Sequence, residues 1–95
     1  MYYKKSLWNL QGYEKSSRKG KMYNALIKHR NNGKIVRIPF GSTDYENYRD
    51  KTNLNLYPKL IHNDKNRRSR YRKRMKHSVR GEYYSPSWFS YNILW

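Results

Sequence analysis

The stretch that decides the fold is KMYNALIKHRNNGKIVRIPF, residues 21–40, in which two apolar segments flank an Asn-Asn-Gly sequence at residues 31–33. β-Branched residues such as valine and isoleucine favour strands, and asparagine and glycine tolerate the positive φ values that tight hairpin turns require. A β-hairpin over about residues 21–40 is therefore predicted. Pro39 lacks the amide hydrogen of a sheet ladder, so we expect it to end the second strand or to mark an edge strand.

Downstream of the hairpin, a basic segment lies between a helix start signal and a helix stop signal. Asn63 and Asp64 carry short side-chain oxygens that can accept hydrogen bonds from the free amides of a first turn. Gly81 suits the position after the last turn. A helix over about residues 64–80 is therefore predicted.

This predicted helix has one narrow apolar stripe. Tyr71, Met75 and Val79 recur at i, i+4 and i+8, and we expect the stripe to lie on the hairpin. The acids within residues 40–50 are too few to offset the bases, so an anionic partner should neutralise the remaining charge. The candidate anion-binding residues are Lys65, Arg67, Arg68, Arg70, Arg72, Lys73, Arg74, Lys76 and Arg80.

Both ends of the chain are rich in aromatic residues. Residues 1–20 show neither a helical stripe nor strict alternation, and they are predicted to form an extended basic and aromatic arm. Residues 82–95 form an aromatic tail in which Pro86 argues against one continuous helix. Each end either folds back on its own domain or docks on a neighbouring protein. The candidate docking residues are Tyr2, Tyr3, Trp8, Trp88, Phe89 and Trp95.

These segments together predict an α+β fold. A small β-hairpin packs against one basic helix, and aromatic N- and C-terminal segments are extended. Residues 1–20 form the arm and residues 21–95 form the domain. A chain of 95 residues is expected to hold one domain with a small core.

Composition excludes several classes of function. The formal net charge is +16 and the sequence pI is near 10.3, which favours nucleic acid, acidic protein surfaces or other polyanions as partners. There is no cysteine, so disulfides, thiolate nucleophiles and cysteine-based zinc sites are excluded. No apolar run approaches the roughly 20 residues of a membrane-spanning helix, and no membrane partner is expected.

Histidine chemistry is the remaining route to an enzyme. His29, His62 and His77 are dispersed, so no metal site is expected. His62 and Asp64 are two residues apart, as in some nuclease fragments, but a general base also needs an oriented partner and a metal or oxyanion site. We expect this pair to serve helix entry, and we expect no catalytic residue, cofactor or small-molecule substrate.

One set of positions resembles a known family. The matching text is Phe40-Gly41, Asp44-Tyr45, His62-x-Asp64-x-x-Arg67-x-x-x-Tyr71-x-x-Arg74 and Ser90-x-x-Ile93-Leu94-Trp95. It is similar to small basic proteins of unassigned function that are encoded by large DNA viruses and tailed phages. This chain departs from that pattern at Met75, where the family usually has histidine. The resemblance implies a viral source and an α+β domain, and it supplies no catalytic residues.

Charge and resemblance together lead to two expected functions. The first is a virion component, a minor capsid or internal head protein. Its basic helix would face packaged DNA or RNA or an acidic capsid-protein surface, and its aromatic ends would dock on neighbouring capsid or virion proteins. The second is a free, sequence-nonspecific nucleic-acid-binding protein that acts in the host cytoplasm or nucleus during infection. No DNA- or RNA-reading motif is present, so phosphate contacts should dominate in either case.

Overall fold

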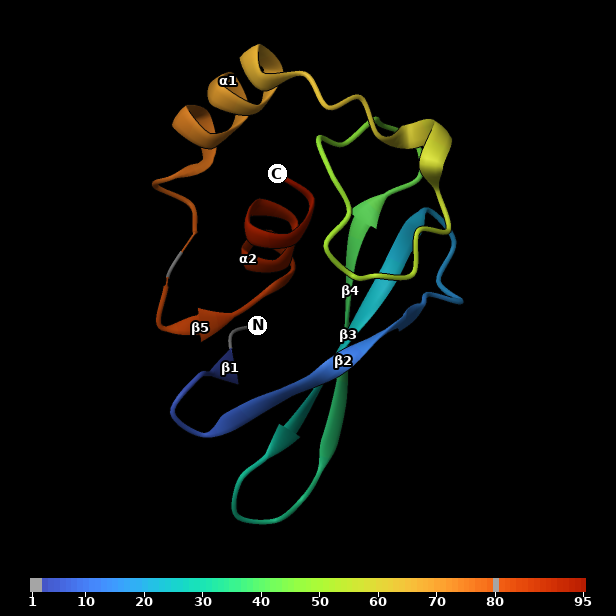
Figure 1. The fold of residues 1–95 in the computed structure, drawn as a ribbon. Helices are drawn as coiled ribbons and strands as arrows, with labels where there is room; N and C mark the ends of the chain where they lie inside the picture. Colours follow the sequence, from blue (N-terminus) through green and yellow to red (C-terminus); the bar gives the residue numbers. More distant parts are fainter. Residues whose placement is uncertain (1–2, 80) are drawn as a thin grey trace.

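The hairpin predicted from residues 21–40 is confirmed in the computed structural model, which describes residues 3–79 and 81–95 (Figure 1). Strand β3, Lys21–His29, pairs antiparallel with β4, Ile35–Ser42, through a turn in which Gly33 has φ 71°. Pro39 does not end β4 but lies inside it, opposite Asn24. The position is tolerated because β4 is an edge strand of the sheet, as the sequence also suggested.

The N-terminal segment is part of the fold rather than an arm. Strand β2, Trp8–Lys15, pairs with β3 and completes the three-stranded sheet in the order β2-β3-β4. The register shifts between Leu10 and Gly12. This bulge interrupts the alternation that would have identified a strand from sequence, and the predicted arm is corrected accordingly. A shorter strand, β1, Tyr3–Lys4, pairs with β5, Tyr83–Tyr84, so the start of the described chain lies beside the strand that precedes the C-terminal helix.

The C-terminal segment is helical throughout most of its length. Helix α2, Pro86–Phe89, continues into the π-helical turn η2, Ser90–Leu94, but strand β5 precedes it, so residues 82–95 do not form one continuous helix, as predicted. Pro86 occupies the first turn, where its missing amide has no partner to lose. Ser85 caps the same turn by accepting from the Trp88 N–H at 3.1 Å. In Figure 1 this segment lies between the sheet and the basic helix.

The core forms where the C-terminal segment meets β3 and β4. Its buried members are Met22, Tyr23, Ala25, Ile27, Ile38, Phe40, Phe89, Leu94 and Trp95. Gly41 lets the two parts approach closely, because its φ is +76° and a Cβ there would lie 2.8 Å from Leu94 Cδ1. No helix in residues 3–79 and 81–95 is long and apolar enough to cross a membrane.

The basic helix α1, Lys65–Met75, is shorter than predicted and rests on a different part of the fold. It ends at Met75, before the predicted stop at Gly81, and farther along the chain the Glu82 carbonyl oxygen accepts from the Lys5 N–H at 2.9 Å. Val79 is therefore outside the helix. Tyr71 stacks on Trp95 with ring centroids 4.2 Å apart and an interplanar angle of 10°. The apolar stripe thus meets the C-terminal segment rather than the hairpin.

Between β4 and α1, residues 43–64 form a loop that encloses the short 3-10 helix η1, Pro58–Leu60. Hydrogen bonds join this loop to the end of the C-terminal segment. The amides of Tyr48 and Arg49 both donate to the Leu94 carbonyl at 3.0 Å, and the Trp95 indole donates to Asn47 Oδ1 at 3.2 Å. These bonds fix the loop beside the start of α1.

Candidate functional site

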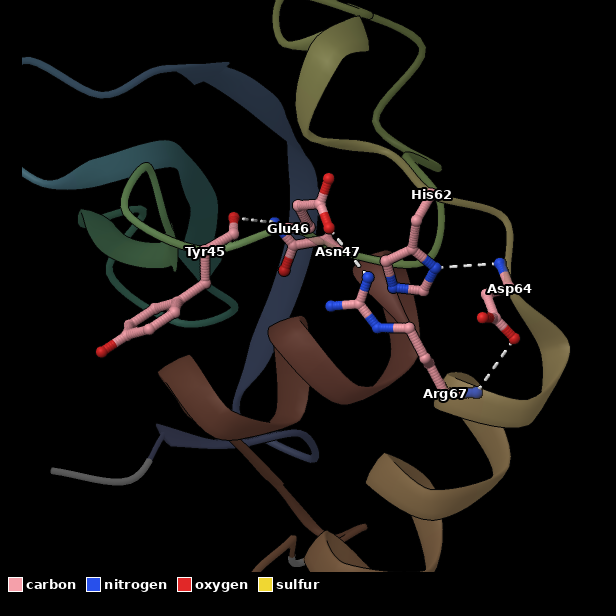
Figure 2. A network of polar contacts seen from close by, with 6 residues as sticks. All are labelled: Tyr45, Glu46, Asn47, His62, Asp64 and Arg67. Atoms are coloured by element: carbon pink, nitrogen blue, oxygen red, sulfur yellow. Dashed lines mark hydrogen bonds and ion pairs between the residues drawn. The ribbon is translucent and has the colours of Figure 1, made fainter.

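The start of α1 is set by the predicted cap. Asp64 Oδ1 accepts from the Asn66 N–H at 2.9 Å and from the Arg67 N–H at 3.2 Å, which confirms Asp64 as the N-cap. The hydrogen bonds from the amides of Arg67 and Asn66 lower the pKa of Asp64. His62 Nδ1 accepts from the Asp64 N–H at 2.8 Å, as Figure 2 shows. Both side chains therefore serve helix entry.

The surroundings of His62 disfavour its charged form. Burial lowers its pKa, and the positive charge of Arg67 acts in the same direction. Its ring lies 5.1 Å from the Trp95 ring, and its Nε2 is buried without a hydrogen-bond partner. A charged imidazolium would lose the hydrogen bond to Asp64 and gain no compensating acceptor.

Two of the predicted anion-binding arginines instead hold the fold together. Arg68 Nε donates to the Trp95 carbonyl at 2.8 Å, and Arg72 Nη1 donates to the Tyr91 carbonyl at 3.0 Å. Their guanidinium groups also lie over aromatic rings, Arg68 5.0 Å from Tyr48 and Arg72 4.0 Å from Tyr91. These contacts attach α1 to the C-terminal segment, so Arg68 and Arg72 are only partly available to a ligand.

A third arginine of α1 is paired with an acid. Arg67 Nη1 lies 2.8 Å from Glu46 Oε1, and Figure 2 shows the two side chains meeting between the loop and the helix. The hydrogen bond and charge of Arg67 lower the pKa of Glu46. The acidic segment of residues 40–50 therefore pairs with the helix through Glu46. Asp50 instead accepts from the Tyr23 hydroxyl at 2.5 Å, and Asp44 makes no ion pair with a described residue.

The remaining cations of this region are unneutralised. They are exposed, and no ion pair joins any of them to an acid within residues 3–79 and 81–95. Arg74 lies 5.7 Å from the Tyr71 ring. Arg80, also predicted to bind anions, lies outside the described residues. The exposed set consists of Lys65, Arg70, Lys73, Arg74 and Lys76.

A cleft opens beside this exposed set. It has a volume of about 510 Å³ and lies between α1, the end of β4 with the following loop, and the C-terminal segment. Three arginines and three aromatic rings contribute to its walls. The lining residues are Gly41, Ser42, Tyr45, Glu46, Asn47, Arg67, Arg70, Tyr71, Arg74, Ser90 and Trp95. The sequence placed the arginines on one helix but contained no signal that Tyr45 and Trp95 would face them.

The predicted docking aromatics lie mostly inside the fold. Phe89 is fully buried and Trp95 is 8% exposed, so neither is available to a neighbouring protein, and this part of the docking hypothesis is corrected. Tyr3, Trp8 and Trp88 are half-buried against the core. These rings pack against one another and against the core because this packing removes large apolar areas from water. Tyr2 lies outside the described residues.

The described residues hold no group of three or more His, Asp or Glu side chains that could bind a metal ion. No protein-family model, curated protein or solved structure matches the chain. The candidate site therefore rests on its own geometry, which is an exposed cationic helix face beside an aromatic cleft.

Proposed function

We propose that this chain is a non-enzymatic virion component, a minor capsid or internal head protein that binds packaged nucleic acid through α1. The observation that carries the proposal is the division of the α1 cations. Arg68 and Arg72 hold the fold and Arg67 is paired with Glu46, but five neighbouring cations have no acid among the described residues.

Phosphates are the partner chemistry that suits this face best. Arginine presents a planar fork of donors that matches phosphate oxygens, and lysine adds mobile point charges. Like charges within a few helical turns destabilise one another, and a polyanion would relieve that repulsion while releasing its own counterions. Such binding would be strong at low salt and largely indifferent to base sequence.

The virion setting rests on the family resemblance and the net charge of +16. With Phe89 and Trp95 buried, contacts to capsid proteins would use half-buried aromatics such as Trp8 and Trp88, or the basic surface itself. The alternative remains a free nucleic-acid-binding protein that acts during infection. Both functions use the same helix face.

Charge reversal on α1 tests the binding. We expect Arg70→Glu with Arg74→Glu to weaken binding of a labelled oligonucleotide by at least about ten-fold, because both side chains are exposed and lack acid partners. The salt dependence should also become shallower, by about 0.9 in the logarithmic slope for each duplex phosphate that the variant no longer neutralises.

The matched control is Lys28→Glu with Lys34→Glu, which makes the same change in net charge at the exposed far end of the hairpin. Fluorescence anisotropy over a salt series would measure the oligonucleotide affinity of both double variants. Equal weakening by the two pairs would show that net charge, and not α1, determines binding.

The protein composition of purified particles tests whether this chain is a virion component. Quantitative mass spectrometry of purified particles, before and after a high-salt wash of opened capsids, would follow this chain against the major capsid protein. Release together with the genome is the result expected of a nucleic-acid-binding component. Complete absence from particles would favour the free binding protein.

A further inference from the structure

Simple phosphate binding would use the arginines of the cleft beside α1 and would leave its aromatic side chains without a role. We infer that the cleft takes one unpaired nucleotide of a single-stranded nucleic acid, with the base against Tyr45 and the phosphates on Arg70 and Arg74. This inference rests on the proposed function and deepens it, because it names the form of nucleic acid that the site selects.

The cleft has the size and composition that such a ligand needs. Its volume of about 510 Å³ falls within the range of small-molecule sites, roughly 300–1,000 Å³. Tyr71 and Trp95 form an aromatic wall, stacked on each other and held by the hydrogen bond from Trp95 to Asn47. The wall is therefore preorganised, which limits the entropy lost on binding.

Tyr45 is the free aromatic surface of the cleft. It is 73% exposed, the highest value among the exposed large hydrophobic residues, and it stacks on no other ring in residues 3–79 and 81–95. In Figure 2 its side chain points away from the pair formed by Glu46 and Arg67. An exposed tyrosine beside cations is the arrangement in which single-strand-binding proteins stack a base.

The arginines supply the phosphate side of the site. Arg70 and Arg74 are one helical turn apart, both line the cleft, and neither has an acid partner among the described residues. The single acid at the cleft, Glu46, is paired with Arg67 at 2.8 Å. Its charge is thus partly compensated, and repulsion of an incoming phosphate is reduced.

A single strand fits this arrangement better than a duplex. Bases in a duplex are stacked on one another and cannot reach Tyr45, whereas an unpaired base presents its whole face. A duplex would use only the exposed cations of α1. The cleft therefore predicts a preference that phosphate contacts alone cannot produce.

Abasic oligonucleotides separate the two contributions. The probes are a thymidine oligomer of about 12 nucleotides, an abasic strand with the same number of phosphates, and a duplex of the same length. We expect the full-length wild-type chain to bind the thymidine oligomer roughly five-fold or more tighter than the abasic strand. Tyr45→Ala should abolish this difference, and Tyr45→Trp should retain it.

Each other outcome overturns the inference in a recognisable way. Equal affinity for thymidine and abasic strands, with steep salt dependence, would leave α1 as a phosphate-binding helix and remove the base site. Tighter binding of the duplex would do the same. Displacement of the oligomer by an equal concentration of free thymidine monophosphate would assign the cleft to a free nucleotide. Absence of binding to every probe at low salt would refute the proposed function as well.

Discussion

Replacing Tyr23 with phenylalanine removes one oxygen atom that ties the core to the loop of residues 43–64. The Tyr23 hydroxyl donates to Asp50 Oδ2 at 2.5 Å and accepts from the Leu56 N–H at 3.1 Å. Burial of the ring and the hydrogen bond to Asp50 raise the pKa of Tyr23 to about 12, so the hydroxyl keeps its proton at all physiological pH values.

The cost of this change follows from its two hydrogen bonds. A bond to a charged group contributes about 1.5–3 kcal/mol and a neutral one about 0.5–1.5 kcal/mol. In the variant, Asp50 keeps the Thr52 amide and hydroxyl as hydrogen-bond donors. Leu56 is 46% exposed, so water can accept from its N–H in place of the Tyr23 hydroxyl. We expect Tyr23→Phe to lower the free energy of unfolding by about 2 kcal/mol, or the Tm by about 8–16 °C for a domain of this size.

Thermal and urea unfolding would measure the effect, with Tyr45→Phe as the matched control. Tyr45 undergoes the same chemical change at a 73% exposed position, where no significant loss is expected. A double-mutant cycle with Asp50→Asn would isolate the pair. The reasoning is refuted if Tyr23→Phe melts with the wild type, or if the cycle gives no coupling between Tyr23 and Asp50.

Three further predictions concern α1 and its surroundings. Tyr71→Ala should lower the free energy of unfolding by about 2 kcal/mol, because a half-buried stacked ring is removed, and unchanged urea unfolding would contradict the observed helix packing. Since burial lowers the pKa of His62 from its usual 6.5, the unfolded state binds the proton more readily, and stability should fall as the pH drops below about 6.5. Urea unfolding measured at about pH 7.5 and at about pH 5.5 would show this loss of stability, because histidine titrates between these values. The variant His62→Gln should show a smaller change of stability with pH. Glu46→Gln should raise oligonucleotide affinity several-fold by removing the acid that pairs with Arg67, and unchanged anisotropy titrations would count against the cleft as an anion site.

Features that depend on neighbours in the sequence were predictable. The Asn31-Asn32-Gly33 turn needs only residues that tolerate its backbone angles, and the Asp64 cap needs only amides two and three residues away. The position of Pro39 on an edge strand follows from the missing amide. Each of these is a local consequence of residue type.

Features that depend on packing were not predictable in the same way. The bulge between Leu10 and Gly12 obscured strand β2 in the sequence, and the helical run after Pro86 was not recognised because a proline can either break a helix or begin one. Helix α1 ends at Met75, although the basic run and the predicted stop signal lie farther along the chain. Propensity and periodicity do not contain these long-range constraints.

The candidate site also has features that the sequence predicts and features that depend on packing. The sequence by itself determined a strongly basic helix with a capped start, because charge and capping are properties of adjacent residues. Only the tertiary structure decided that Arg68 holds the C-terminal segment, while Arg70 and Arg74 line a cleft to which Tyr45 also contributes. The physical reason is that the role of a guanidinium depends on which carbonyls, rings and acids surround it, and here those groups come from segments far away in the chain.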